Sequence, residues 1–201
     1  MRKFGTAVIL AGGKSSRMGF DKQFLNINKK GIINIIISKL EKEFDDIIIV
    51  TNKPDEYKNY RQKIITDILE NMGPLGGIHS GLKAASSEYS FVIACDMPNV
   101  DIEYVRYMKN AVNSVDADIC VTRIGNNIEP LYGFYSLKTA KDIEKYLSEG
   151  KRAVAPLIKK LNTKYIGEKE YNREGLKLNT DIFINLNTQK DLADYLSKIK
   201  G

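Results

Sequence analysis

Short runs of Val and Ile alternate along this chain with longer stretches that carry apolar residues at helical spacing. The runs 6–11 (TAVILA), 47–51 (IIIVT) and 91–94 (FVIA) are each short enough for one buried strand. Strands separated by helices of roughly ten residues predict βαβ units. Because these strands are apolar almost throughout, both faces of the sheet must be covered. The sequence therefore predicts an α/β fold, a three-layer αβα sandwich with a mostly parallel central sheet.

The remaining elements are predicted from the same patterns. Further strands are expected at 63–67, 118–123, 131–135 and 181–186. Helices are expected at 32–40, 55–60, 77–85, 101–113, 138–148, 154–161 and 188–199. The polar residues 168–180 (EKEYNREGLKLNT) are expected to form a mobile loop. The length of 201 residues and the absence of a linker-like tract predict a single domain, 1–201.

Composition excludes several classes of protein. Hydrophobic residues make up 43% and charged residues 28% of the chain, as in soluble globular proteins. No apolar stretch approaches the roughly 20 residues that span a membrane. Two distant cysteines, Cys95 and Cys120, and the single His79 argue against a structural zinc site and favour a reducing compartment. We expect a cytoplasmic protein without a membrane partner.

The net charge of +6 is unevenly distributed. Residues 1–30 hold seven basic groups and one acidic group, 31–150 hold 13 and 18, and 151–201 hold 11 and six. Basic ends suit polyanionic ligands, although solvated lysines on surface helices would look the same. No dense basic run with interleaved aromatic residues is present, which argues against a nucleic-acid partner.

A glycine-rich basic segment follows the first predicted strand. Residues 10–22 read LAGGKSSRMGFDK, with Gly12 and Gly13 directly after the strand. Glycines at this position let backbone N–H groups approach a phosphate closely. Arg17 and Lys22, together with Lys14, add positive charge where a triphosphate would lie. The segment is neither a Walker A loop nor the dinucleotide motif G-x-G-x-x-G, and it predicts a phosphate site.

Two acidic residues end other predicted strands. Asp96 follows the run FVIAC, and Asp101 already has the position of a helix N-cap, so Asp96 is available for another role. A strand-end carboxylate opposite a phosphate loop is suited to Mg²⁺, which usually takes one or two carboxylates plus phosphate oxygens. Asp67 precedes the glycine-rich stretch 73–77 (GPLGG), which predicts a tight loop over a ligand, although a plain turn would look similar.

These motifs together resemble the molybdenum cofactor guanylyltransferases, within the wider family of nucleotidyltransferases. The likeness lies in LAGGKSSRMGFDK, GPLGGIHSGL and CDMP, and continues in EPL (129–131), GKR (150–152) and NLNT (185–188). It spans nearly the whole chain. The resemblance implies a Rossmann-like fold, GTP and Mg²⁺, and transfer of GMP from GTP to molybdopterin with release of pyrophosphate.

The resemblance also implies site residues. GTP would contact Leu10, Ala11, Gly12, Gly13, Lys22, Asn52, Asp67 and Asp96, with Asp96 also on the metal. Molybdopterin would contact Arg152, Asn185 and Asn187. The nucleotide-binding part would then cover about 1–120 and the acceptor-binding part about 121–201. The product would pass to molybdoenzyme apoproteins or cofactor-delivery proteins, and the chain would be a monomer or a weak oligomer.

The reaction requires positioning more than covalent chemistry. The acceptor phosphate would attack the α-phosphorus of GTP, while Lys22 and Arg17 offset negative charge and Asp96 holds Mg²⁺. A general base is not needed, because a phosphate monoester is largely anionic at pH 7.

Other functions remain open at this stage. The molybdopterin cytidylyltransferases resemble LAAG where this chain has LAGG, and the methylerythritol cytidylyltransferases resemble Lys22-Gln23-Phe24 but lack a CDMP-like motif. A non-catalytic cofactor carrier would need no acid for a metal. A dehydrogenase is disfavoured by the missing G-x-G-x-x-G. Gln189, where the resembled family commonly has proline, departs from the late motif.

Overall fold

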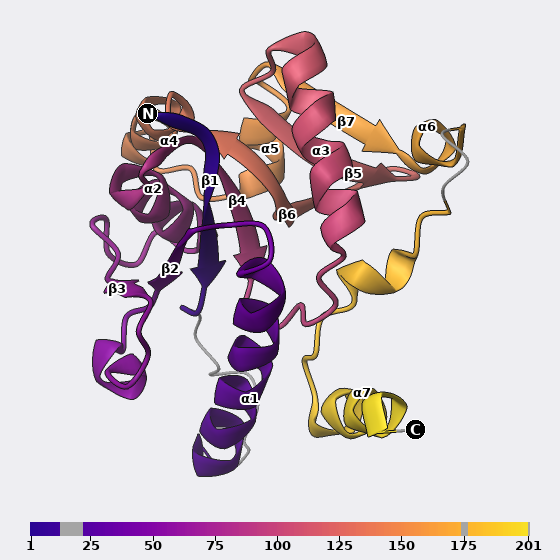
Figure 1. Cartoon of the computed structure of the whole chain (residues 1–201). Helices are drawn as coiled ribbons and strands as arrows, with labels where there is room; N and C mark the ends of the chain where they lie inside the picture. Colours follow the sequence, from indigo (N-terminus) through magenta and orange to yellow (C-terminus); the bar gives the residue numbers. More distant parts are fainter. Residues whose placement is uncertain (13–21, 174–176, 201) are drawn as a thin grey trace.

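A single mixed sheet forms the centre of the protein (Figure 1). The computed structural model describes residues 1–12, 22–173 and 177–200. The described strands are β1 (Arg2–Leu10), β2 (Asp46–Val50), β3 (Lys63–Ile65), β4 (Ser87–Ala94), β5 (Ile119–Ile124), β6 (Asn127–Ser136) and β7 (Thr163–Gly167). Their order is β3-β2-β1-β4-β6-β5-β7, and all neighbours are parallel except the two that pair with β6. The predicted mostly parallel sheet is confirmed.

Helices cover both faces of this sheet. The helices are α1 (Lys22–Leu40), α2 (Pro74–Ala84), α3 (Ile102–Val115), α4 (Thr139–Ser148), α5 (Val154–Ile158), α6 (Glu168–Arg173) and α7 (Gln189–Lys200), with 3-10 turns at Pro54–Tyr57 and Thr180–Phe183. Buried side chains of α1 and α3 form one core layer, and those of α2, α4 and α5 form the other. The predicted αβα sandwich is confirmed.

Alternation along β1 explains why both layers form. Ala7 and Ile9 contribute to the layer under α1 and α3, whereas Val8 and Leu10 contribute to the layer under α2. All four side chains are buried. A strand with apolar side chains on both faces can be stable only between two helical layers, because each buried aliphatic side chain contributes about 1.5–3 kcal/mol.

The register brings several strand ends to one edge. Leu10 pairs with Val50 on one side and with Ala94 on the other, and Val50 pairs with Ile65. The chain therefore leaves β1, β2, β3 and β4 at the same edge, at the foot of the sheet in Figure 1. The segments that carry the predicted phosphate loop, Asp67 and Asp96 all begin there.

The strand predicted at 181–186 is wrong. Thr180–Phe183 forms a 3-10 helix that begins at Asn179, whose side chain accepts a hydrogen bond from the amide of Asp181. The apolar residues Ile182 and Phe183 are buried, and the Phe183 ring lies 5.4 Å from the Tyr132 ring. The apolar side chains therefore pack on the sheet face and add no strand to the sheet.

Two other elements differ from the prediction. β7 was not predicted, because only Ile166 of its five residues is fully buried and no apolar run marks it. Part of the polar stretch 168–180 forms helix α6 and was predicted as a loop. Tyr171 of α6 is buried, with its ring 4.9 Å from Tyr104 and 4.8 Å from Tyr107. One aromatic side chain packed on α3 thus anchors a helix in a polar segment.

Candidate active site

The end of β1 is fixed by both neighbouring strands. The carbonyl oxygen of Leu10 accepts from the amide of Cys95 at 3.1 Å, and the amide of Ala11 donates to the carbonyl of Val50 at 2.8 Å. Gly12 follows, and a Cβ placed on it would lie 3.9 Å from Nδ2 of Asn52. The first residues of the predicted phosphate loop are thereby held beside the end of β2.

Asn52 and Asp67 meet at this edge. Nδ2 of Asn52 donates to Oδ2 of Asp67 at 3.2 Å. Asp67 is half-buried, and burial raises the pKa of its carboxyl group, while the hydrogen bond from Asn52 acts in the opposite direction. The pair presents a carboxylate oriented by an amide, which is suited to accepting hydrogen bonds from a ligand with N–H or O–H donors.

Gly76 and Gly77 make room for the Asp67 carboxylate at the start of α2. A Cβ on Gly76 would meet the carbonyl oxygen of Leu69 at 2.9 Å, and a Cβ on Gly77 would meet Cδ2 of Leu10 at 3.0 Å. Each Cβ would also lie 3.7 Å from an Asp67 carboxylate oxygen. A side chain at Gly76 would push α2 away from the loop at Leu69, and one at Gly77 would push it away from Leu10 of β1, so both glycines are required by close packing.

Asp96 follows β4, the strand that pairs with β1 on the side away from β2, and comes directly after Cys95. Its side chain is half-buried, and its backbone carbonyl accepts from the amide of Leu186 at 2.9 Å. Asp101 is the N-cap of α3 and accepts from the amides of Glu103 and Tyr104 at 2.9 and 3.1 Å. Asp101 therefore caps the helix as predicted, and the cap does not require the Asp96 carboxylate.

The C-terminal segment brings Asn185 and Asn187 to Asp96, since they flank Leu186 on both sides. Nδ2 of Asn185 donates to the carbonyl of Phe183 at 3.3 Å. The amide of Asn187 donates to the Asp191 carboxylate at 3.0 Å, and the Asp191 amide donates to Oγ1 of Thr188. This reciprocal cap begins α7, and Asn187 takes part in it through its backbone, which leaves its exposed side chain to solvent or ligand.

Arg152 lies elsewhere in the described structure. Its guanidinium donates to the carbonyls of Leu147 and Lys151, both at 2.9 Å, at the end of α4. α4 belongs to the layer with α2, whereas Phe183 before the asparagines packs in the opposite layer. Among the described residues, no hydrogen bond joins Arg152 to Asn185 or Asn187, so the three predicted acceptor residues form two separate groups.

Some predicted site residues lie outside the described residues. Gly13 and Arg17, with Lys14 and Gly19, fall in the stretch 13–21. Lys22 begins helix α1, but its side chain also lies outside the described part. The described site therefore comprises Leu10, Ala11, Gly12, Asn52, Asp67 and Asp96, with the two asparagines beside it.

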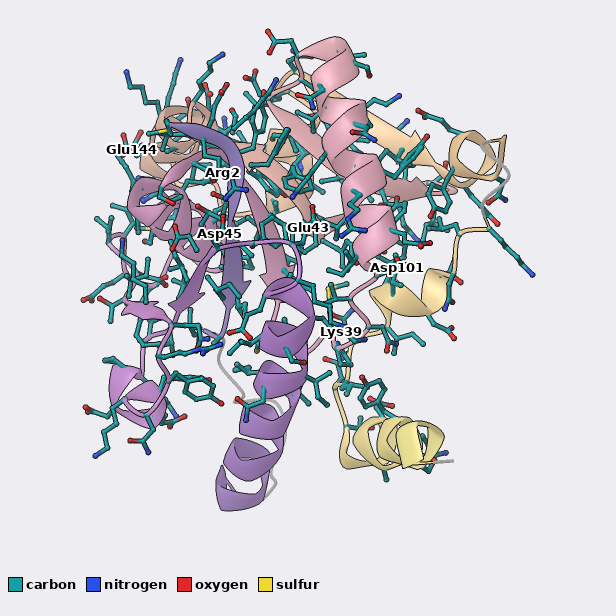
Figure 2. All side chains as sticks on the ribbon, viewed as in Figure 1. Arg2, Lys39, Glu43, Asp45, Asp101 and Glu144 are labelled. Atoms are coloured by element: carbon teal, nitrogen blue, oxygen red, sulfur yellow. The ribbon has the colours of Figure 1, made fainter. Side chains whose placement is uncertain are left out.

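Two hollows lie near this edge. One of about 590 Å³ runs between the end of α1, the start of α3 and the C-terminal segment, and its lining includes Lys39, Asp101, Leu186 and Tyr195. Figure 2 labels two of these lining residues, Lys39 near the upper end of α1 and Asp101 below α3. The other, of about 410 Å³, lies along the outer edge at β3 and its lining includes none of the predicted site residues.

The donor set at the edge is compatible with magnesium. Within residues 1–12, 22–173 and 177–200, no group of three or more His, Cys, Asp or Glu side chains converges as a metal cage. Mg²⁺ needs only one or two carboxylates when phosphate oxygens supply the remaining ligands. A single half-buried carboxylate at Asp96, on the strand next to the one that leads into the predicted phosphate loop, fits that requirement.

One functional candidate was not found from the sequence. Ser80 lies inside the motif GPLGGIHSGL, is fully buried, and hydrogen-bonds the residue after Asp67. The available signal was a hydroxyl within an apolar helical stretch, but serine in a helix is too common for that signal to single it out.

The fold and the edge define a class of protein, the α/β nucleotidyltransferases. The family model described as "MobA-like NTP transferase domain" matches residues 7–164. The chain belongs to this family, and the predicted family is confirmed.

Named relatives agree with this assignment. The chain is 48% identical to the "Probable molybdenum cofactor guanylyltransferase" of Peptoclostridium acidaminophilum, a match covering 96% of this chain and 88% of the relative. It is 43% identical to the "Molybdenum cofactor guanylyltransferase" of Syntrophotalea carbinolica, covering 96% and 91%. The fold resembles molybdopterin-guanine dinucleotide biosynthesis protein A from Archaeoglobus fulgidus, with a TM-score of 0.76 at 22% identity, over 96% of this chain and 99% of that one.

None of the described helices combines the length and the apolar character that crossing a membrane requires.

Proposed function

We propose that this protein transfers GMP from GTP to molybdopterin and releases pyrophosphate, forming the molybdopterin guanine dinucleotide cofactor. The observation that carries the proposal is the juxtaposition at one sheet edge of Gly12, the Asn52–Asp67 pair and Asp96. This arrangement combines a loop start for phosphates, an acceptor of hydrogen bonds for a nucleoside, and a carboxylate for a divalent cation. The guanylyltransferase names of the relatives support GTP as the nucleotide.

The nucleotide would lie across the ends of β1, β2 and β3. Backbone groups of Leu10, Ala11, Gly12 and Gly13 would approach the phosphates, and Asn52 and Asp67 would contact the nucleoside. Guanine offers N1–H and N2–H₂ donors on one edge, and a carboxylate can accept both. Cytosine lacks this pair of adjacent donors, so the same carboxylate would select against CTP.

Transfer itself depends on charge neutralisation and alignment. The acceptor phosphate oxygen would form a bond to the α-phosphorus, and the bond to the bridging oxygen of pyrophosphate would break. Arg17 and Lys22 would hold the phosphates through charge-assisted hydrogen bonds that strengthen as charge develops. Asp96 would hold Mg²⁺, which supplies Lewis-acid neutralisation of the triphosphate when bound. The acceptor phosphate is already anionic near pH 7, so no protein base is needed.

The acceptor would approach from the C-terminal side. Asn185 and Asn187 lie next to the Leu186–Asp96 hydrogen bond, which supports a pterin site close to the metal-binding carboxylate. Side-chain amides can match the mixed donors and acceptors of a pterin ring. Arg152 lies at the end of α4, in the helical layer opposite to the one that packs Phe183, so it would contact the acceptor from that opposite layer. In this proposal residues up to about 120 bind the nucleotide, and residues from about 121 to 201 bind the acceptor. The product then passes to molybdoenzyme apoproteins or cofactor-delivery proteins.

Thermal-shift titration with GTP and with CTP, each in the presence of Mg²⁺, tests the nucleotide assignment. We expect GTP to raise the melting temperature at concentrations where CTP has little effect, because only the ligand that binds the folded state stabilises it. Equal shifts would favour a nucleotidyltransferase without guanine selection, and a shift with CTP alone would favour the cytidylyl alternative. Binding without pyrophosphate release in the presence of acceptor would favour a cofactor carrier.

A further inference from the structure

A buried hydroxyl on α2 ties together the two segments that enclose Asp67. Ser80 is fully buried. Its Oγ accepts a hydrogen bond from the amide of Ile68 at 2.8 Å and donates one to the carbonyl of Gly76 at 2.9 Å. Ile68 directly follows Asp67, and Gly76 lies at the start of α2 against the Asp67 carboxylate. One hydrogen bond therefore involves the residue next to Asp67, and the other involves a glycine whose missing side chain leaves room for the Asp67 carboxylate.

Ser80 adds a backbone anchor to a segment that is also held by the Asn52–Asp67 hydrogen bond and by packing of Leu69 and Met72 on the core. Ile68 is 61% exposed, so burial of its side chain does not hold its backbone in place. The loop that follows contains Asn71 and Gly73, both with positive φ (60° and 64°), and returns the chain to α2. Asn and Gly adopt these conformations readily, whereas the part-buried amide of Ile68 before them needs a specific hydrogen-bond partner. Ser80 supplies such a partner next to Asp67.

The two bonds of Ser80 have different significance. A helical serine that donates to the carbonyl four residues earlier is a common local pattern and needs no functional reason. The bond from Ile68 joins residues twelve positions apart and crosses from the end of β3 to α2. Removing the hydroxyl would leave the Ile68 amide without this acceptor, next to the carboxylate proposed to recognise the nucleoside.

We propose that Ser80 is a positioning residue for nucleoside recognition, which holds Asp67 against Gly76 and Gly77 in the orientation that accepts the donors of guanine. This inference rests on the proposed function. Ser80 touches no substrate. It acts through Asp67, and its loss changes the affinity for the nucleoside part of GTP and leaves the affinity for the phosphate part unchanged.

A double-mutant cycle on Ser80 and Asp67, read by calorimetric binding of GTP and of inorganic tripolyphosphate, tests the inference. Ser80→Ala is expected to weaken GTP about tenfold, a factor equal to roughly 1.4 kcal/mol, and to leave tripolyphosphate binding unchanged. In the Asp67→Ala background, Ser80→Ala should change GTP affinity less than about twofold, because the group it positions is already absent.

Ser90 provides a matched control. Like Ser80 it is fully buried, but in the described part of the chain its hydroxyl has no hydrogen-bond partner, and it lies within β4 away from the strand ends. Ser90→Ala should leave GTP affinity unchanged. If Ser80→Ala does not fold, Ser80→Cys retains a side-chain donor and acceptor on a somewhat larger sulfur atom. Its weaker hydrogen bond is expected to weaken GTP by a smaller factor.

The outcomes separate this inference from the proposed function. Equal losses of GTP affinity with and without Asp67, or equal losses for GTP and tripolyphosphate, would overturn the positioning role. If wild type prefers CTP, the guanine assignment fails, and the same cycle run with CTP still decides the role of Ser80. Wild type that binds no nucleotide would overturn both.

Discussion

The nucleotide side of the candidate site and the C-terminal side are built differently. On the nucleotide side, Gly12, Asn52 and Asp96 follow parallel strands whose register fixes them at one edge. On the C-terminal side, Asn185 and Asn187 follow a 3-10 turn. The segment is held by the hydrogen bond from Leu186 to Asp96, by one from Asn99 to the carbonyl of Asp181, and by packing of Phe183. A residue at a strand end is thus placed by the whole sheet, whereas a residue after the last strand is placed by a few individual contacts.

This difference has an energetic consequence. Moving the backbone of Asn52 relative to that of Asp96 would require breaking several hydrogen bonds between the buried runs of β2, β1 and β4. Moving the C-terminal segment requires losing the Leu186–Asp96 and Asn99–Asp181 hydrogen bonds, about 0.5–1.5 kcal/mol each, and the burial of Ile182 and Phe183. We therefore expect substitutions on the nucleotide side to change chemistry and binding strongly, and those on the C-terminal side to change acceptor binding more modestly.

The largest effect is expected for Asp96→Asn. Loss of the carboxylate removes the proposed metal ligand, and kcat should fall by roughly two orders of magnitude or more. Turnover in saturating Mg²⁺ measures it, with Asp118→Asn as the control, since Asp118 is half-buried at the opposite edge before β5. Near-wild-type turnover of Asp96→Asn would contradict the proposal that Asp96 holds the metal ion.

Lys22→Ala should weaken GTP far more than GMP. A charge-assisted hydrogen bond to the triphosphate contributes about 1.5–3 kcal/mol, which corresponds to roughly 10- to 150-fold in Kd. Calorimetry with both nucleotides measures the difference. Lys42, an exposed lysine just beyond the far end of the 19-residue helix α1, provides the matched charge-removing control. Equal losses for GTP and GMP would place Lys22 away from the β- and γ-phosphates.

The double substitution Asn185→Ala and Asn187→Ala tests the C-terminal side. We expect the apparent KM for molybdopterin to rise about three- to tenfold, as lost side-chain hydrogen bonds of about 1 kcal/mol would produce. GTP affinity and melting temperature should be nearly unchanged. Asn162→Ala is the control, because its side chain also donates to a backbone carbonyl, that of Asp116, at the opposite edge.

The structure sharpens the alternative for these asparagines. Asn185 makes a local bond to Phe183, which a turn-ordering role would require, whereas the Asn187 side chain takes no part in the cap of α7. A melting temperature several degrees lower with an unchanged acceptor KM would assign both residues to ordering the turn.

The smallest effect concerns stability and pH. Burial alone would raise the pKa of Glu43, but hydrogen bonds from Lys109 and Arg106 outweigh it, and the pKa is lowered. These contacts, at 2.7 and 2.8 Å, join the turn after α1 to α3, and Figure 2 labels Glu43 between these two helices. Glu43→Gln should cost about 1 kcal/mol, or roughly 2–4 °C in melting temperature.

The sign of the pH dependence follows from the lowered pKa. The stabilisation is fully present above the pKa of an unfolded carboxyl group and is lost as the pH falls through the lower folded value. The difference in melting temperature between wild type and Glu43→Gln should therefore be constant near pH 7 and shrink in acid. A difference that grows as the pH falls would contradict the ion-pair account.

The fold could be predicted from the sequence where strands are buried on both faces. The runs in β1, β2 and β4 are apolar because two helical layers cover them, so their positions were predicted within a few residues. β7 and the turn at Thr180–Phe183 could not be predicted, since their residues are placed by long-range contacts such as Phe183 with Tyr132. A periodic pattern reports local burial, and it contains no information about such contacts.

The candidate site shows the same division. That Asn52, Asp67 and Gly12 would lie together was predictable, because parallel strands end at one edge. The position of Arg152, which donates to carbonyls at the end of α4, could not be predicted. Its motif resembles that of a family, but the motif alone does not say where the side chain lies in the fold. The role proposed for Ser80 could not be predicted from the sequence, because it depends on the contact between the Ile68 amide and the Ser80 hydroxyl across the loop.

One assay tests the central claim most directly. Wild-type protein is mixed with Mg²⁺, molybdopterin and either GTP or CTP, and released pyrophosphate is measured. The account predicts stoichiometric pyrophosphate release with GTP that depends on molybdopterin, and release with CTP lower by at least tenfold, the factor that about 1.4 kcal/mol of discrimination produces. Equal release with CTP, or no release with GTP when wild type binds it, would contradict the assignment of this sheet edge to guanylyl transfer.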